Sequence, residues 1–372
     1  MYRLMTLAPL ALLAACGLNG TDPDTGEQAP AGKATAATPQ NLADSMASDD
    51  NAVVPSSSTG AAEQRPVMQA QVVLERLGFG AGVIDGREGL STANALKGFQ
   101  EATGLTVTGT LDEPTKAALA RWSRIPATRT VTIPRDWGQG SYIPIPESAA
   151  AQAQLPRLGY ASIEERLAER FHTTAEVLRS LNPALAASGD APSGLRPGQQ
   201  VVVPNIGADR IAPGAVDDQA WVATLASLGV GTQQPKVARI VVDKSEGWLK
   251  GYDEGGELVA MFTVTTGSSH DPLPLGEWGV NGVARNTPFA YDPALFWDVP
   301  DSHAKQQLPP GPNGPVGVVW IDLTKEHYGI HGTPEPQTIG RAESHGCVRL
   351  TNWDAARLAQ MVSGSTKVLF EA

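Results

Sequence analysis

The stretch 344–350 reads Ser-His-Gly-Cys-Val-Arg-Leu and places Cys347 between a histidine and an arginine near the carboxyl end of the chain. His327, His331 and His345 lie close to it in the sequence. Cysteine and histidine at this spacing fit three arrangements: a zinc site, a nucleophilic thiol with a histidine base, or a packed core cysteine beside incidental histidines. The neighbouring residues help to decide among them.

A zinc site would require His327 and His331 to reach one ion. Residues four apart converge on a helix, but the residues between and after these histidines, Tyr-Gly-Ile and Gly-Thr, favour a strand. In a strand, side chains four residues apart are separated by about 13 Å, which is too far for one metal ion. The pattern therefore argues against a metal site.

A packed, inert cysteine is the commoner fate of a free thiol. Gly332 and Gly346 argue against it, because each glycine puts bare backbone beside a reactive side chain. A nucleophilic thiol, with an ordinary pKa near 8.5, needs a histidine that lowers this pKa through an ion pair and later protonates a leaving amine. His331 ends an expected strand and can serve, whereas His345 lies about 6.6 Å from Cys347 along an extended backbone.

The residues around this pair resemble the catalytic domain of the L,D-transpeptidases, the YkuD family. Its signature is a histidine, a spacer, and then Ser/Thr-His-Gly-Cys-x-Arg/Asn, and residues 344–349 match every position. The likeness runs from about 237 to 370. It implies that Cys347 is the nucleophile and that His331 is the general base, steadied by the backbone carbonyl of Gly332.

The resemblance also implies roles for the rest of the motif. Ser344 and His345 would shape the pocket, and Arg349 would either bind a peptide carboxylate or hold the cysteine loop in place. Backbone N–H groups around Gly346 and Cys347 are the expected donors to an oxyanion.

The reaction implied by the resemblance is acyl transfer on peptidoglycan stem peptides, and it needs no cofactor. Cys347 attacks the carbonyl before the terminal D-alanine, D-alanine leaves, and an amine resolves the thioester to give a 3→3 cross-link. Two alternatives stay open on the sequence. Water could resolve the same thioester, which would make the protein a hydrolase, or the chain could be a non-catalytic lipoprotein that anchors the wall.

The elements that must carry this site are predicted to be mainly β. Over residues 236–372, short β-rich runs separated by Gly, Pro and Asp predict a sandwich or barrel, with one clear helix at 352–364. The aromatic and Pro-rich stretch 286–316 is either a lid or a surface loop packed on the barrel. The residues of this stretch that could cover a substrate are Phe289, Tyr291, Phe296 and Trp297.

Residues 63–122 predict a small α-helical domain. One helix should stop at Gly78, a second should begin after the caps Ser91 and Thr92, and a third should follow Asp112. The segment resembles the three-helix peptidoglycan-binding module.

Residues 155–205 predict a small α+β domain. Two helices precede Leu-Asn-Pro and a turn followed by a strand, and this order resembles a LysM module, the βααβ fold that binds glycan chains containing N-acetylglucosamine. Linkers are expected at 123–154 and at 206–235.

The amino terminus predicts export. Residues 1–15 combine Arg3 with a short apolar run and end in Leu-Ala-Ala before Cys16, which resembles the lipobox of bacterial lipoproteins. The resemblance implies that Cys16 carries lipid, so that Cys347 has no disulfide partner in the chain. Residues 16–62 have few bulky apolar side chains and are expected to form a disordered tether. The expected location is the periplasm, at the outer membrane of a Gram-negative bacterium.

The bulk composition excludes one class of partner. The chain has 372 residues, a formal net charge of −11 and a pI near 5.1, and no basic stripe interleaved with aromatics, so nucleic acid is not expected to bind. The 39 glycines and 29 prolines favour loops and β-rich parts over a helical bundle. The expected partners are stem peptides, glycan strands and the membrane, and the chain is expected to be a monomer.

Overall fold

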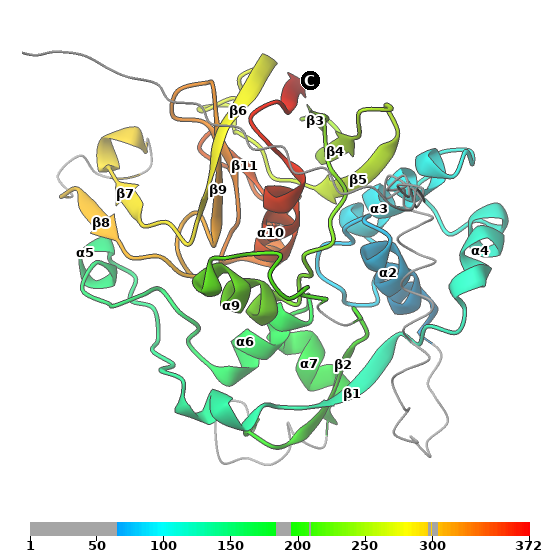
Figure 1. Ribbon diagram of the computed structural model, residues 1–372, viewed down its shortest axis with the longest axis horizontal. Helices are drawn as coiled ribbons and strands as arrows, with labels where there is room; N and C mark the ends of the chain where they lie inside the picture. Colours follow the sequence, from blue (N-terminus) through cyan, green and yellow to red (C-terminus); the bar gives the residue numbers. More distant parts are fainter. Residues whose placement is uncertain (1–64, 184–194, 208–209, 297–298, 300–303) are drawn as a thin grey trace, which may run out of the picture. The chain divides into compact units, whose positions relative to one another are not determined.

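The computed structural model describes residues 65–183, 195–207, 210–296, 299 and 304–372, all of which belong to one compact unit (Figure 1). Within these ranges, no helix is long and apolar enough to cross a membrane. Four predictions concern residues outside the described ranges: the signal peptide at 1–15, lipidation of Cys16, the tether at 16–62 and the role of Trp297.

Two helix boundaries in the amino-terminal region lie where the sequence predicts them. Helix α2 (Pro66–Arg76) ends just before Gly78, whose φ of 99° is a conformation that glycine adopts readily. Helix α4 (Glu113–Leu119) begins at Asp112, whose side chain accepts a hydrogen bond of 2.9 Å from the backbone N–H of Thr115.

The start of helix α3 (Leu90–Ala102) differs from the prediction. Its N-cap is Gly89, so Ser91 and Thr92 lie inside the first turn and do not cap it. The hydroxyl of Thr92 instead donates to the carbonyl of Arg87 at 3.2 Å and so stabilises the preceding loop.

The middle region is a two-stranded sheet whose strands are separated in the sequence by helices. Strand β1 (Thr128–Thr132) pairs antiparallel with β2 (Gln200–Pro204) along the full length of both strands. Helices α6 (Ile163–Arg170) and α7 (Ala175–Leu181) lie between them, and Thr174 caps α7 as the sequence predicts. Apart from two shorter helices between β1 and α6, the order of the described elements is therefore strand, helix, helix, strand.

Strand β1 falls in the stretch 123–154, which the sequence assigns to a linker. The same stretch contains the short helices η2 (Arg135–Gln139) and α5 (Ala149–Gln152). The sequence of β1, Thr-Arg-Thr-Val-Thr, has β-branched residues that favour a strand but no alternation of apolar and polar residues, and its side chains are half-buried or exposed. Its partner β2 lies far along the chain, so no local turn marks the pairing.

Helix α9 (Gln219–Leu228) falls in the second expected linker, 206–235. Its residues Trp221, Leu225 and Leu228 are fully buried in the core of the carboxyl-terminal domain. This stretch is therefore part of the folded protein, because its apolar face packs against α6 and α10 (Asn352–Met361), which cover it.

The carboxyl-terminal domain is mainly β, which confirms the predicted fold class. Its sheet is a single curled one with eight strands in the order β11-β10-β9-β6-β12-β3-β4-β5. The β10–β11 and β12–β3 pairs are parallel, and the other neighbours are antiparallel. The strands are β3 (Arg239–Asp243), β4 (Trp248–Tyr252), β5 (Leu258–Thr263), β6 (Gly276–Arg285), β9 (Val319–Leu323), β10 (Gly329–His331), β11 (Val348–Arg349) and β12 (Lys367–Glu371).

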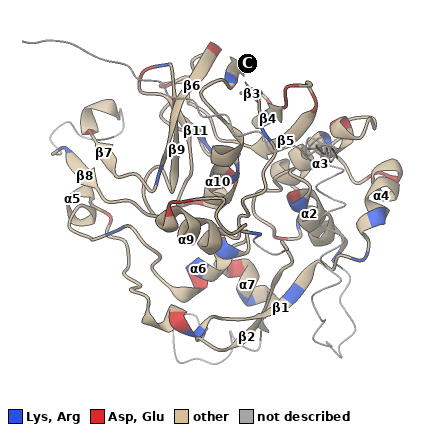
Figure 2. Ribbon diagram, in the orientation of Figure 1, with Lys and Arg blue, Asp and Glu red and all other residues tan. Residues whose placement is uncertain are grey.

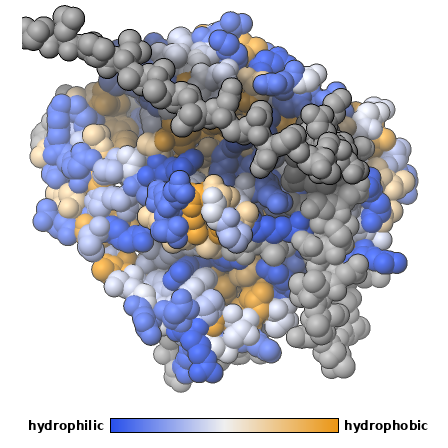
Figure 3. Space-filling model, viewed as in Figure 1, coloured by the Kyte–Doolittle hydropathy of each residue, from blue (hydrophilic) through white to orange (hydrophobic). Residues whose placement is uncertain are grey.

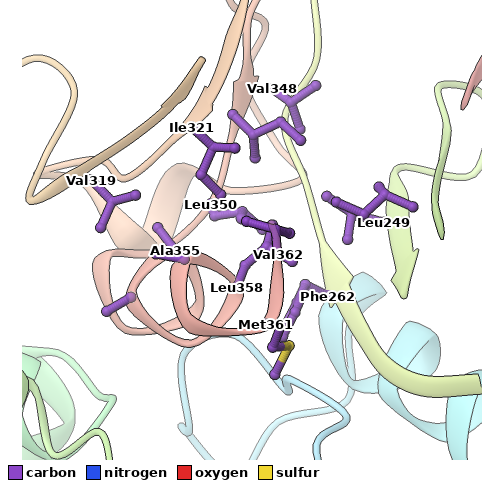
Figure 4. Packing of buried hydrophobic residues seen from close by; sticks show 14 of the residues in the cluster. Leu249, Phe262, Val319, Ile321, Val348, Leu350, Ala355, Leu358, Met361 and Val362 are labelled. Carbon is purple, nitrogen blue, oxygen red and sulfur yellow. The ribbon is translucent and has the colours of Figure 1, made fainter. Parts of the chain in front are cut away.

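Helix α10 (Asn352–Met361) packs on this sheet and closes its core. Figure 4 shows Leu358 of the helix among apolar side chains from β9 and β11, including Ile321 and Val348. All three side chains are fully buried. Because α10 follows β11 almost directly, this packing also fixes the strand that leads out of the cysteine motif.

The helical region covers the free edge of the sheet at β5. The backbone N–H of Gly80 donates to the carbonyl of Met261 at 2.8 Å, and the N–H of Met261 donates to Gly78 at 3.3 Å. The amide of Asn94 in α3 donates to the hydroxyl of Thr263 at 3.2 Å. An exposed strand edge is a site for unwanted pairing, and these contacts cover it.

A buried cluster of charged groups joins α2, the loop after α6, and α10. The carboxylate of Glu75 accepts from the guanidinium of Arg357 at 3.0 Å and contacts Nδ1 of His172 at 3.0 Å. The ring of His172 stacks on Trp353 with 4.8 Å between centroids. Despite burial, the charge of Arg357 and the bond to His172 keep the pKa of Glu75 below its ordinary value. The cluster fixes α10 relative to both preceding regions.

Charged side chains of both signs are spread over the helices and loops of the structure. In the view of Figure 2, Lys and Arg residues of the described chain are scattered and form no continuous basic stripe. The face shown in Figure 3 is mostly hydrophilic, with small apolar patches between polar ones.

Candidate active site

His331 ends strand β10, and Cys347 immediately precedes β11, the neighbouring parallel strand. Strand β10 pairs with β11 so that Ile330 stands opposite Val348 and His331 opposite Arg349. Ile330 and Val348 are fully buried in the core. Successive side chains in a strand alternate between faces, so His331 and Arg349 project from the other face together, and Cys347 is the residue just before β11.

The cysteine segment is fixed at both ends by the residues that follow β5. Thr265 exchanges two backbone hydrogen bonds with Arg349, of 2.8 and 3.1 Å, and the N–H of Ser344 donates to Thr266 at 3.0 Å. The hydroxyl of Ser344 donates to the carbonyl of Cys347 at 2.6 Å. Ser344 is buried, so it acts on the shape of this turn and does not present its hydroxyl to solvent.

Gly346 allows the turn that presents the thiol. Its φ is 100°, and a Cβ added there would lie 2.7 Å from the ring of Tyr328. Both facts require glycine at this position, because other residues would be strained and would also displace the tyrosine ring.

His331 is held in one orientation and one tautomer. Its Nδ1 lies 2.7 Å from the carbonyl oxygen of Gly332 and donates to it, since a carbonyl only accepts. The ring stacks on Trp320 with 5.5 Å between centroids and 21° between planes. Nε2 therefore carries the free lone pair, which is what a general base requires.

Burial sets the charge states of His331 and Cys347. It lowers the pKa of His331 to about 4, with a further lowering by the charge of Arg349, while the bond to Gly332 opposes the shift. Burial also raises the pKa of Cys347 above its ordinary value, against the opposing effects of a backbone hydrogen bond and of Arg349. The sequence favours an ion pair with a lowered thiol pKa, whereas the structure holds a neutral imidazole and a neutral thiol.

The aromatic stretch 286–316 contacts the cysteine segment through one residue. The ring of Phe296 meets that of His345 edge to face, with 5.1 Å between centroids, and stacks on Tyr291 at 5.6 Å. Strands β7 (Phe289–Tyr291) and β8 (Gln306–Leu308) pair beside it. His345 thus belongs to the wall of the site, next to the stretch that could cover a substrate.

His327 does not join the other histidines. Its side chain is 69% exposed and faces Glu326, while its carbonyl oxygen lies 3.8 Å from the sulfur of Cys347. No cluster of three or more His, Cys, Asp or Glu side chains suited to a metal occurs in the described part of the chain.

Sequence reasoning missed the residues that support the site from other elements. Trp320, Tyr328, Thr265 and Asn352 all contact the histidine or cysteine segments. Only the pairing of the strands brings them there. Trp320 stands opposite His331 in the register of β9 and β10, which a correct strand alignment would have indicated.

Two family models match separate parts of the chain. Residues 237–369 match the model described as "L,D-transpeptidase catalytic domain", and residues 63–119 match the "Putative peptidoglycan binding domain". Residues 237–369 are therefore similar to L,D-transpeptidase catalytic domains, and residues 63–119 are similar to peptidoglycan-binding domains.

Curated relatives agree with this assignment. The chain is 29% identical over 204 residues to "Putative L,D-transpeptidase YkuD" of Bacillus licheniformis, which covers 55% of this chain and 90% of that protein. It is 51% identical over 57 residues to the protein of the same name in Bacillus subtilis, covering 15% and 35%. It is 29% identical over 135 residues to "Probable L,D-transpeptidase YbiS" of Escherichia coli K12, covering 35% and 44%. The chain thus spans less than half of the last two relatives.

Proposed function

We propose that this protein is a peptidoglycan L,D-transpeptidase that forms 3→3 cross-links through a thioester on Cys347. The acyl donor is a tetrapeptide stem, and D-alanine is released. The family match to residues 237–369 supports an acyltransferase. The observation that carries the proposal is the β10–β11 register, which supports a base with a free Nε2 at His331 next to the strand that Cys347 precedes.

The first half of the reaction forms the acyl-enzyme. Because both groups start neutral, Nε2 of His331 takes the thiol proton while the sulfur of Cys347 attacks the carbonyl before D-alanine. The hydrogen bond to Gly332 stabilises the imidazolium that forms. The C–N bond then breaks, and the amine of D-alanine leaves with the proton from His331.

The second half transfers the acyl group. An amine from a neighbouring stem attacks the thioester, His331 accepts its proton, and the sulfur of Cys347 leaves and is reprotonated. Water in place of the amine would give a tripeptide and no cross-link. Backbone N–H groups at Gly346 and Cys347 are the proposed oxyanion donors. Arg349 is positioned to bind a carboxylate of the stem or to hold the cysteine loop.

The preceding regions are proposed to bind the substrate polymer. The match to residues 63–119 supports wall binding by the helical region. The strand-helix-helix-strand order between β1 and β2 supports a LysM-like, glycan-binding role for the middle region, with its first strand at Thr128–Thr132 and not after residue 155. We also propose a periplasmic location with Cys16 lipidated at the outer membrane.

The product spectrum tests this function. We expect purified protein incubated with disaccharide-tetrapeptide fragments to give a dimer lighter by one D-alanine, read by mass spectrometry. Tripeptide monomer without dimer would replace the transpeptidase by a hydrolase. A protein that binds intact sacculi but releases no D-alanine would favour the wall-anchoring alternative.

Gly346→Ala is expected to slow D-alanine release about 10²-fold, since a small displacement of reacting groups has an effect of this size. The added Cβ would meet the ring of Tyr328 at 2.7 Å. Strain at this φ costs about 1–3 kcal/mol, which urea unfolding should detect. Gly364→Ala is the matched control, because its nearest neighbour would lie at 3.9 Å. A normal rate in Gly346→Ala would contradict the role given to this turn.

A further inference from the structure

Directly behind the catalytic histidine lies a buried asparagine that the mechanism above does not use. Asn352 is the first residue of α10 and is completely buried. Its Oδ1 accepts from the backbone N–H of Val318 at 3.2 Å. A Cβ on Gly332 would collide with the same Oδ1. The Asn352 amide is therefore in close packing with the peptide whose carbonyl orients His331.

The other end of this amide is held by the middle region of the chain. Its Nδ2 donates to Oε1 of Glu169 in α6 at 2.7 Å and to the carbonyl of Pro312 at 3.0 Å. Glu169 is buried as well. Three hydrogen bonds and a steric contact thus define the position of Asn352, and one of the bonds comes from outside the catalytic domain.

The middle region also fixes the second acceptor. The backbone of Leu158 donates to Pro310 at 3.0 Å and accepts from Asn313 at 3.0 Å. The side chain of Asn313 donates to the carbonyl of Gly159 at 2.9 Å. These bonds fix the chain on both sides of Pro312. Residues 158–169 therefore set both acceptors of the Asn352 amide.

The burial of the Glu169 carboxyl group beside Asn352 requires an explanation. Burial raises the pKa of Glu169 to about 7, against the opposing effects of Tyr160 and Asn352 and with a small increase from Glu165. Burying a carboxyl group has an energetic cost that an apolar side chain at the same position would not have. The hydrogen bond from Asn352 offsets this cost, and it gives the buried carboxyl group a role, which is to hold the Asn352 amide.

We propose that Glu169 and Asn352 are positioning residues for His331, so that the middle region completes the active site of the catalytic domain. Glu169 orients the Asn352 amide, the amide sets the position of the Gly332 peptide, and that peptide orients the imidazole. The consequence is that the domain of residues 236–372 depends on α6 for full activity. This inference rests on the proposed function for its kinetic test.

Three variants separate positioning from simple stability. Glu169→Met keeps the bulk and removes the acceptor, whereas Glu169→Gln keeps an acceptor oxygen and removes the charge. Glu164→Met is the matched control, because Glu164 is also buried in α6 but accepts two hydrogen bonds from Arg179 of α7. All three are made in the full chain, and circular dichroism checks that each folds.

For D-alanine release from the tetrapeptide fragment, we expect Glu169→Met to lower kcat about tenfold with KM changed less than twofold. Glu169→Gln and Glu164→Met should stay within twofold of the wild type on both parameters. Equal loss in Glu169→Gln and Glu169→Met, or an unchanged kcat in folded Glu169→Met, would overturn the proposal. So would failure of Glu169→Met to fold, because Glu169 would then be a purely structural residue.

A second readout does not depend on the substrate. The rate at which iodoacetamide alkylates Cys347 at pH 7 should fall in His331→Ala and, to a lesser extent, in Glu169→Met, but not in Glu169→Gln. If the wild-type chain released no D-alanine, the proposed function would fail while this comparison still tested the positioning of His331. An alkylation rate that depends on His331 but is identical in Glu169→Met and the wild type would overturn the proposal alone.

Discussion

Cys347→Ala is expected to abolish both D-alanine release and dimer formation, a loss of at least about 10³-fold. Removal of the sulfur leaves no atom that can form the thioester, and the other groups at the site cannot replace it. The side chain is only partly exposed and makes few contacts, so the fold should tolerate alanine. The measurement is mass analysis of fragments after incubation with equal amounts of wild type and variant.

The control for this variant is its binding to intact sacculi. Binding should be unchanged in Cys347→Ala, because the helical region that matches the peptidoglycan-binding model lies in residues 63–119. Dimer formation by a folded Cys347→Ala protein would show that the acyl group is carried elsewhere. In that case the proposed mechanism, though not the family match, would have to be abandoned.

The second large effect concerns pH. A free histidine loses its function as a base below a pKa of about 6.5, but the pKa of His331 is about 4. A lowered pKa means that the imidazole stays neutral until the pH falls to about 4. We therefore expect kcat/KM for D-alanine release to be flat from about pH 7.5 to 5.5 and to fall only near pH 4.

The charge of Arg349 contributes to the lowered pKa of His331. Removing this charge should therefore change the pH at which kcat/KM falls on the acid side. Arg349→Met should raise the pKa of His331 and shift this fall to higher pH. The folded state must be checked by circular dichroism, because a histidine with a lowered folded pKa destabilises the protein as the pH falls from about 6.5 to about 4. If kcat/KM of the folded wild-type protein already fell at pH 6.5, the neutral charge states of His331 and Cys347 would be contradicted.

The neutral charge states of His331 and Cys347 determine how reactive Cys347 is. A thiol whose pKa is raised by burial is a weak nucleophile until a base removes its proton during attack. The site is therefore selective, since only an acyl group placed beside both Cys347 and His331 is attacked efficiently. Such a thiol is also less prone to oxidation, which suits a cysteine that we propose to lie in the periplasm.

The sequence by itself predicted the candidate residues of the site and determined several helix boundaries. Cys347 and His331 could be chosen because nucleophilic catalysis needs those two side chains, and the motif around them is specific. Asp112 and Thr174 cap their helices as predicted, because capping is a hydrogen bond over two or three residues. Local signals of this kind held at these two helices, whereas at α3 the predicted caps Ser91 and Thr92 lie inside the first turn.

The tertiary structure decided everything that depends on distant partners. The pairing of β1 with β2 and the packing of α9 against α6 and α10 join residues with no local signal between them. The pKa values of His331 and Cys347 follow from burial, which no residue type or spacing shows. The contact of Glu169 with Asn352 spans two regions. The physical reason is the same in each case: desolvation and long-range pairing are properties of the packed chain, whereas turns, caps and reactive side chains are properties of short segments.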